Sequence, residues 1–472
     1  MAAPAPQLVP DDSDPTFAEL IAGRPHLSVH AHDGLTMEEV PLARIAAAVG
    51  TPTWVYSAGT LRRRFHALRG ALDDARVPAE LHFAVKANPN LAVVRTLAKE
   101  GAGADIVSEG ELRLALAAGI DPSHVVFSGV GKTLGELRFA LSHRIGQINA
   151  ESAEEIGMIS AVATEMGVVA DVALRVNPDV DARTHAKITT GKSENKFGVA
   201  IADAPALYAR MAATPGVNPV GIAVHIGSQI TSGVSAYAAA YAALADLVRA
   251  LREQGLSVER VDCGGGLGIP YRHEPAPSPA ALAGAIRGAL GNLGVKLMVE
   301  PGRWICGPAG VLLTQVILQK HTPSLSGSAG GSLSGSAEGS LSGSAGGSRR
   351  FVILDAAMND LLRPAMYDAW HGIVPVGPRE FVSPVSPCDV VGPVCETGDT
   401  FARNRGLPML EPGSLVAFLD AGAYGASMSS TYNARPLAAE VLVDGDRFAV
   451  VRARQTQEAL LAGQRLPEWL AG

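Results

Sequence analysis

Short apolar runs alternate with longer stretches rich in alanine and leucine between about Thr51 and Gly310. HFAVKA precedes NLAVVRTLAKEG, GADIVS precedes GELRLALAAG, and VVFSGV precedes LGELRFALSH. An apolar run bounded by turn residues is typical of a buried strand, whereas the longer stretches have the length and periodicity of helices. About eight such units predict an α/β fold, a (β/α)8 barrel over residues 51–310. A doubly wound open sheet is the alternative that the same local pattern allows.

The pattern changes after Gly310. The apolar runs VLLTQVILQK, RRFVILDAA, SLVAFLDAG and AEVLVDGDRFAVVRAR are separated by turn residues, and few helical stretches lie between them. This pattern predicts an antiparallel β domain over residues 311–472. We expect the N-terminal segment, residues 1–50, to join this β domain.

Residues 324–348 interrupt the β domain with SLSGSAGGSLSGSAEGSLSGSAGGS, three copies of an eight-residue unit followed by one serine. A segment of serine, glycine and alanine has almost nothing to bury, so it is predicted to be a flexible loop. Because it lies between two strand-like runs, we interpret it as an expanded hairpin turn. A long surface insertion costs little closure entropy, so the fold can carry it. An engineered insert is the alternative.

Composition excludes several classes of function. The chain has 472 residues, too many for one ordinary core, and its formal net charge of -7 offers no basic surface for nucleic acid. Four cysteines without Cys-x-x-Cys spacing predict neither a disulfide framework nor a zinc site. The opening MAAPAPQLVPDDSDP lacks the basic start and apolar core of a signal peptide, and no apolar run approaches the length of a membrane span. We therefore expect a soluble, cytoplasmic protein without a metal.

Distinctive residues follow the predicted barrel strands, at the end where such barrels hold their active sites. They are Lys86, Asp105 with Glu111, Arg175, the segment HIGSQ (His225 to Gln229), CGGGLGIPY and VEPGRWICG. A lysine after an apolar run is costly unless it is paired, deprotonated or covalently used. A lysine that begins a loop and reaches water is the ordinary alternative for one such residue, but six placements together indicate a site.

The glycine run GGGLG, Gly264 to Gly268, could direct several backbone N–H groups at one anion such as a phosphate, although a tight turn is the alternative. SGVGKT, Ser128 to Thr133, is not a P-loop, because Val126 stands where that motif needs glycine. Glu300 could pair with Arg303. In combination with Lys86, however, it could keep a pyridine nitrogen protonated while the lysine bonds to a cofactor aldehyde.

Six motifs carry a resemblance to a known family. FAVKAN, HIGSQ, GGGLGIPY, EPGR, CETGD (Cys395 to Asp399) and DAGAYGASMSSTYNARP (Asp420 to Pro436) resemble the pyridoxal-phosphate decarboxylases of the alanine-racemase-like barrel fold. Within that group, they most closely resemble the diaminopimelate decarboxylases. The likeness runs in the correct order from about Thr51 to the C-terminus, and only the repeat at 324–348 clearly departs from it.

The resemblance implies a cofactor, pyridoxal 5'-phosphate, and its contacts. Lys86 would carry the cofactor, Glu300 would face its ring nitrogen, and His225 would stack on its ring. Asp105, Glu111 and Arg175 match positions that set up the lysine and the ring. The phosphate and the neighbouring substrate would be surrounded by Ser228, Gly265, Gly266, Pro301, Gly302, Arg303 and Tyr424.

The β domain would supply the substrate contacts. By the resemblance, Cys395 is a proton donor that enters the site of a neighbouring subunit, so the protein is predicted to be a homodimer. Glu396 would hold the distal ammonium of the substrate. Arg363 and Tyr367, a guanidinium and a phenol, suit a second carboxylate. Surface ion pairing and core packing are the alternatives for these two residues.

The combination of Glu396 with Arg363 predicts a substrate that has both an ammonium and a carboxylate at its far end. Meso-2,6-diaminopimelate has this pattern, and its decarboxylation yields L-lysine and CO2. Two alternatives remain open. One is another decarboxylase of the same fold, acting on ornithine, arginine or carboxynorspermidine, or a racemase. The other is a non-catalytic regulatory protein that binds the cofactor.

Overall fold

Eight parallel strands form a closed barrel in the computed structural model, which describes residues 14–181, 196–323 and 348–470. Each strand pairs with two neighbours, and the ring closes because the last strand pairs with the first. Closure confirms the predicted barrel and excludes the open sheet. The strands are β5 (Ala79–Ala84), β6 (Gly103–Ile106), β7 (Val125–Phe127), β8 (Gln147–Ala150), β9 (Ala170–Asn177), β11 (Val217–Ala223), β12 (Arg260–Asp262) and β13 (Lys296–Val299).

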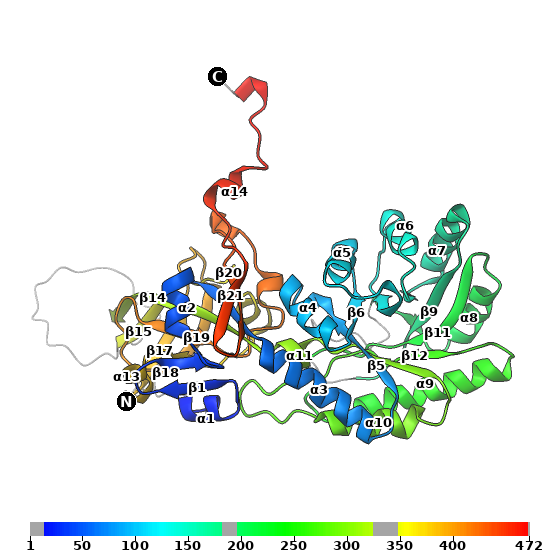
Figure 1. Cartoon of the computed structure of the whole chain (residues 1–472), viewed down its shortest axis with the longest axis horizontal. Helices are drawn as coiled ribbons and strands as arrows, with labels where there is room; N and C mark the ends of the chain where they lie inside the picture. Colours follow the sequence, from blue (N-terminus) through cyan, green and yellow to red (C-terminus); the bar gives the residue numbers. More distant parts are fainter. Residues whose placement is uncertain (1–13, 182–195, 324–347, 471–472) are drawn as a thin grey trace, which may run out of the picture.

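Helices surround the barrel (Figure 1); the first precedes β5 and the others follow barrel strands. Their starts are set by side-chain caps: Ser108 accepts a hydrogen bond from the backbone of Glu111, and Thr133 forms a capping box with Glu136. Their buried apolar faces pack against the strands in one continuous core. These helices are α3 (Ala58–Asp74), α4 (Leu91–Lys99), α5 (Glu109–Ala117), α6 (Leu134–Ser142), α7 (Ala153–Met166), α8 (Ala204–Ala212), α9 (Ser235–Glu253) and α10 (Pro279–Leu290).

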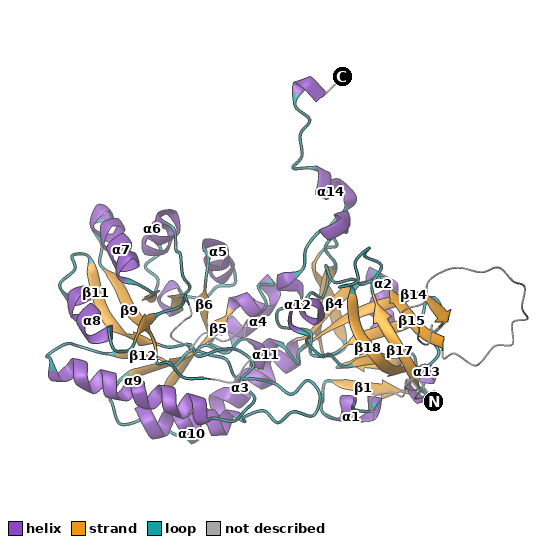
Figure 2. Ribbon diagram, turned by 180° about the vertical axis from the view of Figure 1, so that it is seen from behind, coloured by secondary structure: helices purple, strands orange, loops and turns teal. Residues whose placement is uncertain are grey.

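A second sheet forms the other lobe of the molecule (Figure 2). Most of its pairings are antiparallel, but β15 with β17 and β4 with β20 are parallel, so the sheet is mixed rather than purely antiparallel. Its main path is β18 (Thr400–Leu407), β17 (Ser386–Val391), β15 (Ser348–Leu354), β14 (Gly310–Pro323), β4 (Thr53–Ser57), β20 (Ala439–Asp444) and β21 (Arg447–Arg452). Two further strands, β16 (Ile373–Pro375) and β19 (Leu415–Phe418), pair with each other, and β19 also pairs with β14.

Strand β4 lies outside the barrel, although the sequence division at residue 51 assigns it to the barrel. It pairs with β14 on one side and with β20 on the other. All five of its residues are buried, so its apolar run has the same appearance as that of a barrel strand. The local pattern carries no information about which sheet such a strand joins.

The described part of the N-terminal segment packs on this second lobe. Strands β1 (Leu27–His30), β2 (Gly34–Met37) and β3 (Val40–Pro41) form a small antiparallel sheet. Buried side chains of β2 share one apolar cluster with residues of β4, β14 and β20. Residues 324–347 of the serine-glycine repeat lie outside the described residues, and its last residue, Ser348, begins β15. The strands β14 and β15 pair antiparallel up to Pro323 and Ser348. The predicted flexibility of the repeat stays a prediction.

Backbone contacts join the two lobes where the first barrel strand ends. The N–H of Tyr424 donates to the carbonyl of Ala87 at 2.8 Å, and the side-chain amide of Asn88 donates to the carbonyl of Gly422 at 3.0 Å. The chain end, including α14 (Gln457–Leu461), extends away from both lobes (Figures 1 and 2). In the part of the chain that the structure describes, no helix is long and apolar enough to cross a membrane.

A substitution at Gly34 tests how the N-terminal segment is attached to the second lobe. The φ of this glycine is +67°, and an added Cβ would lie 2.1 Å from the carbonyl oxygen of Val376, which also accepts a hydrogen bond from Leu35. We expect Gly34→Ala to destabilise the fold by at least about 1 kcal/mol, because the backbone strain and the clash add. The measurement is the midpoint of thermal unfolding.

Gly70→Ala in α3 is the matched control. Gly70 has nothing within 4 Å of an added Cβ, so alanine should stabilise the helix by about 0.5–1 kcal/mol. Equal midpoints for the two variants would contradict the proposed attachment.

Candidate active site

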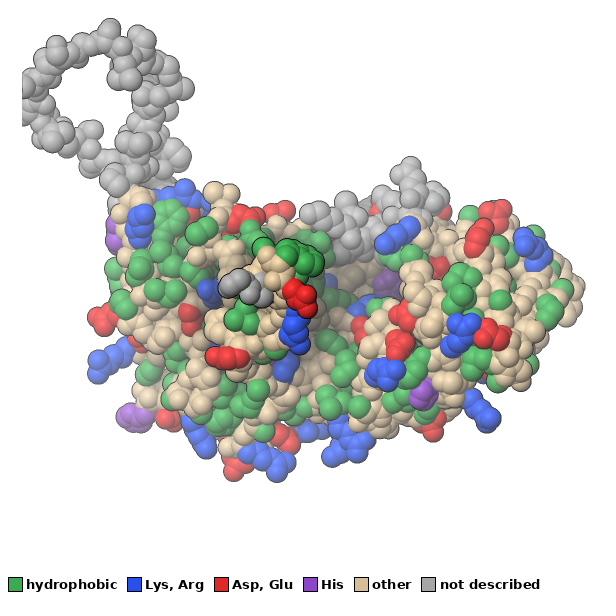
Figure 3. Space-filling model, turned by 90° about the horizontal axis from the view of Figure 1, so that it is seen from above, with side chains coloured by type: hydrophobic (Ala, Val, Ile, Leu, Met, Phe, Trp, Pro, Cys, Tyr) green, Lys and Arg blue, Asp and Glu red, His purple; other side chains and the backbone are tan. Residues whose placement is uncertain are grey.

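A cavity of about 440 Å³ lies where the carboxyl ends of the barrel strands face the second lobe. Figure 3 looks down on the hollow between the two lobes. The barrel contributes Lys86, His225, Ser228, Tyr271 and Arg303, and the second lobe contributes Arg363, Tyr367, Trp370 and Tyr424. The cavity is therefore built by both lobes together, and several residues predicted from the sequence line it.

Lys86 follows β5 in a short 3-10 turn, Val85–Ala87. Its Nζ donates to Oδ2 of Asp105 at 2.8 Å, and Asp105 is fully buried at the end of β6. Burial lowers the pKa of Lys86, but the charges of Asp105 and Glu300 outweigh this effect and raise it. The lysine is thus held in the cavity by a carboxylate and does not simply begin a loop.

Two further carboxylates lie beside Lys86. Glu300 follows β13 and Asp262 ends β12; both line a smaller space of about 190 Å³ that Lys86 also reaches. Burial raises the pKa of Glu300 well above its ordinary value, and the charges of Asp105 and Asp262 raise it further. Oε1 of Glu300 and Oδ1 of Asp105 are buried without a hydrogen-bond partner among the described residues. Each such atom is costly, which indicates that the space is shaped for a donor from outside the chain.

Glu111 lies near this cluster at the start of α5. Its carboxylate accepts a hydrogen bond from the N–H of Val107 at 2.7 Å, and burial raises its pKa to about 7.

His225 comes after β11 and lines both spaces. Burial lowers its pKa well below the ordinary value, and the charges of Lys86 and Arg175 add to this effect, so the ring is neutral. Its Nδ1 accepts a weak hydrogen bond of 3.3 Å from the N–H of Gly265. A neutral, buried ring can pack on a flat group without the cost of burying a cation.

The glycine run differs from the sequence expectation in one respect. The N–H of Gly264 donates to Asp262 at 2.9 Å, and that of Gly265 turns to His225, so these two groups do not converge freely on one anion. The backbone packs too closely for side chains: a Cβ on Gly265 or Gly266 would lie 2.1 or 2.2 Å from a carbonyl oxygen. Close backbone packing therefore requires glycine here in addition to any role in binding an anion.

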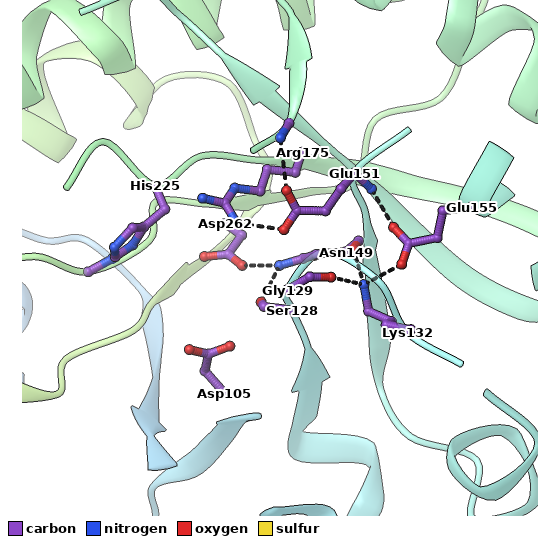
Figure 4. Close-up of polar contacts among 12 residues, drawn as sticks. Asp105, Ser128, Gly129, Lys132, Asn149, Glu151, Glu155, Arg175, His225 and Asp262 are labelled. Carbon is purple, nitrogen blue, oxygen red and sulfur yellow. Dashed lines mark hydrogen bonds and ion pairs between the residues drawn. The ribbon is translucent and has the colours of Figure 1, made fainter. Parts of the chain in front are cut away.

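Arg175 is held by a chain of buried ion pairs and hydrogen bonds that Figure 4 shows. Its Nη1 donates to Oε1 of Glu151 at 2.6 Å, and the backbone of Glu151 donates to Glu155 at 2.7 Å. Glu155 in turn accepts from Lys132 at 3.0 Å, and Lys132 also donates to the carbonyls of Gly129 and Asn149. All three donors of Lys132 are thus used inside the protein, which explains SGVGKT without any phosphate.

Arg303 and Arg363 are buried in the cavity wall without any carboxylate partner in the described part of the chain. Arg303 donates to the hydroxyls of Tyr271 at 2.8 Å and Ser228 at 3.2 Å, and its guanidinium lies 4.8 Å from the ring centre of Tyr424. The predicted alternatives, a Glu300–Arg303 ion pair and a surface ion pair of Arg363, are therefore wrong. Two uncompensated guanidiniums make this end of the cavity suited to carboxylates.

Cys395 and Glu396 are exposed on the loop after β17 and do not line the cavity. Glu396 accepts a hydrogen bond from the hydroxyl of Tyr432 at 3.1 Å. Within one chain, the two residues are thus separate from Lys86.

Three comparisons place this geometry in a family. A sequence model of the pyridoxal-dependent decarboxylases, pyridoxal binding domain, matches residues 58–307. Diaminopimelate decarboxylase of Zymomonas mobilis is 46% identical over 439 residues, which cover 92% of this chain and 98% of that protein. The enzyme of Pseudomonas aeruginosa is also 46% identical, over 92% of this chain and 97% of its own. The chain belongs to the diaminopimelate decarboxylase family.

A solved diaminopimelate decarboxylase, from M. jannaschii in complex with L-lysine, superposes with a TM-score of 0.85 at 33% identity. The superposition covers 95% of this chain and 99% of that one. The two-lobed architecture is therefore that of the diaminopimelate decarboxylases. The family model implies a pyridoxal cofactor, and the unpartnered Oε1 of Glu300 fits the protonated nitrogen of a pyridine ring.

Sequence reasoning missed several residues of the site. Asp262 follows the same rule as Glu300, a carboxylate at a strand end, and stands two residues before the glycine run, so its signal was present. Tyr271 lies within the quoted motif GGGLGIPY. Glu151 also follows a strand, β8, but nothing local shows that its partner is Arg175. Long-range pairing of this kind has no signature in a single sequence.

The raised pKa of Glu300 predicts a pH dependence of stability. A carboxyl with a raised folded-state pKa binds its proton more tightly in the folded protein than in the unfolded one. Its contribution to the free energy of unfolding is therefore lost as pH rises through that pKa. Gln resembles the protonated acid and does not titrate. In the cofactor-free protein, we therefore expect Glu300→Gln to raise the thermal midpoint more at pH 8 than at pH 5.

Glu165→Gln in α7 is the control for this experiment. Glu165 is exposed and paired with Arg138, which lowers its pKa, so its loss should be slightly destabilising at both pH values. A gain from Glu300→Gln that does not change with pH would contradict the charge argument.

Proposed function

We infer that the chain catalyses the pyridoxal phosphate-dependent decarboxylation of meso-2,6-diaminopimelate to L-lysine and CO2. One observation carries the choice of substrate. Arg303 and Arg363 are buried without carboxylate partners in the same cavity as Lys86, so the cavity is charged for a substrate with carboxylates. A substrate that loses one carboxylate as CO2 needs a second carboxylate to pair with these guanidiniums. Family membership supports the same reaction.

The residues around Lys86 suit the cofactor. Lys86 supplies the primary amine that bonds to the cofactor aldehyde, and Asp105 holds its Nζ in place. Glu300 would accept the N–H of the ring, and His225 would pack on the ring face. Arg175, which Glu151 holds, would lie beside the ring. When bound, the cofactor accepts the electron pair that the departing CO2 leaves behind.

The phosphate is assigned to the glycine run and the loop after β13. Gly265, Gly266, Pro301 and Gly302 lie along these segments, and Ser228 lies in the loop after β11. A Cβ on Gly302 would lie 3.1 Å from that of Ala87 and 3.5 Å from the hydroxyl of Tyr424, so a larger residue would intrude on the lysine turn and the cavity. We propose that glycine is required at position 302 because it leaves the cavity beside the lysine turn open.

The distal end of the substrate is bound by the second lobe. Arg363 and Tyr367 contact the carboxylate that is retained in lysine, together with Arg303 and Tyr424, which lines the cavity beside them. These residues hold and orient the substrate, so the carboxylate that leaves as CO2 is directed toward Lys86.

A second subunit completes the site. Cys395 and Glu396 lie outside the cavity of their own chain, so we propose that Cys395 of the partner subunit protonates the carbon that lost CO2. Glu396 of the partner subunit binds the distal ammonium. A thiol suits this step because its ordinary pKa of about 8.5 lies near the working pH. The active species is a homodimer.

The substrate prediction is tested by CO2 release. Purified protein with pyridoxal phosphate should release CO2 from meso-diaminopimelate, with L-lysine as product, and not from ornithine, arginine or lysine. Release of CO2 from ornithine, arginine or lysine would support decarboxylation but would reject the assignment of a substrate with two carboxylates. Cofactor absorbance without release from any substrate would favour the non-catalytic alternative.

The shared site is tested by mixing two inactive variants, Lys86→Ala and Cys395→Ala. Half of the dimers in an equal mixture are hybrids, and one of the two sites in each hybrid contains both native residues. Because only such sites are complete, we expect activity to return to about a quarter of the wild-type value after subunit exchange. No recovery, with hybrid dimers shown by mass spectrometry, would place both residues in the same subunit's site.

A further inference from the structure

The hydroxyl of Tyr271 lies between the two guanidiniums of the cavity. Nη1 of Arg303 donates to it at 2.8 Å and Nη1 of Arg363 donates to it at 2.9 Å. Tyr271 follows the glycine run, is only 5% exposed, and lines the cavity. One phenol thus bridges two cations that come from different lobes of the molecule.

These contacts leave the hydroxyl hydrogen of Tyr271 available for a hydrogen bond to another group. The phenol oxygen accepts from both arginines, and a tyrosine O–H has one hydrogen to give. In the described part of the chain, no acceptor for that hydrogen lies within hydrogen-bond distance. The ring has a fixed position, edge-on to His371 with ring centres 5.2 Å apart, and the guanidinium of Arg363 lies 4.9 Å from its centre.

His371 holds the other side of Arg363 without neutralising it. Its Nδ1 lies 2.9 Å from the carbonyl oxygen of Leu419, which can only accept, so Nδ1 carries the hydrogen. Nε2 then accepts from Nη1 of Arg363 at 2.9 Å. Arg363 is therefore fixed by two neutral acceptors, Tyr271 and His371, and keeps its full charge for a ligand.

We propose that Tyr271 is a positioning residue for the retained carboxylate of the substrate: it fixes the spacing of Arg303 and Arg363 and donates its own O–H to that carboxylate. The identity of the substrate rests on the proposed function. Three groups then converge on one anion, two guanidiniums and a hydroxyl, and a hydrogen bond to a charged group is stronger than one between neutral groups. Tyr271 thereby becomes a determinant of specificity, because an amine without this carboxylate gains nothing from it.

L-lysine and cadaverine are a matched pair of ligands for this proposal. Both have two amines on a five-carbon chain, and only lysine has the carboxylate that is retained after the reaction. Binding of each ligand to the cofactor-loaded dimer can be measured by calorimetry without any turnover. The wild-type protein should bind lysine more tightly than cadaverine.

Tyr271→Phe removes the hydroxyl and keeps the ring. We expect it to weaken lysine binding about tenfold or more and to change cadaverine binding less than about twofold, since only lysine loses a hydrogen bond to its charge. With diaminopimelate, KM should rise by a similar factor and kcat should change little. A general disturbance of the fold would weaken the binding of lysine and of cadaverine by a similar factor.

Tyr208→Phe is the matched control. Tyr208 is buried in α8, and its hydroxyl donates to the carbonyl of Ser257 at 2.8 Å, remote from the cavity lining. This variant should lose stability but bind both ligands like the wild type.

Three results would overturn the proposal: unchanged lysine affinity in Tyr271→Phe, equal weakening of lysine and cadaverine, or a wild-type protein that binds the two ligands equally. If diaminopimelate is not decarboxylated but lysine binding still depends selectively on Tyr271, the proposed function fails and the carboxylate site stands.

Discussion

The distribution of buried charge is the constraint on which the site depends. Lys86 pairs with Asp105 and shares a small space with Asp262 and Glu300. Arg303 and Arg363 stand in the adjoining wall without carboxylate partners among the described residues. Uncompensated charge inside a protein is expensive, so both groups are maintained at a cost to stability. A cofactor with a cationic ring nitrogen would relieve the first group, and a substrate with a carboxylate would relieve the second. The barrel and the second lobe serve to hold these two regions next to each other.

Much of the fold was predictable because the barrel repeats one local pattern. Each βα unit carries its own periodicity, and the chemistry at strand ends follows from the parallel arrangement, so Lys86, Glu300 and His225 could be placed before the structure was known. Strand β4 shows where this reasoning ends. Its buried residues look like those of a barrel strand, and only pairing with β14 and β20 assigns it to the other sheet. Pairing partners far apart in sequence leave no local signal.

The site shows the same division between local and distant information. Residues inside short motifs were found because a motif is local. The bridge from Arg303 through Tyr271 to Arg363 joins segments that are separated by about 90 residues, and the hold of Glu151 on Arg175 crosses between two barrel strands. Such contacts depend on how the lobes and strands come together, and they determine which charges are compensated and which are left for a ligand.

The position of β4 also has a consequence for synthesis of the chain. The strand precedes the whole barrel in sequence, yet its two neighbours, β14 and β20, follow the barrel. The barrel is therefore an insertion within the second lobe. During translation, β4 leaves the ribosome roughly 250 residues before its first partner, a delay on the order of 10–50 s at ordinary elongation rates. The barrel can fold in that interval, whereas the apolar β4 stays without its strand partners until β14 has been synthesised.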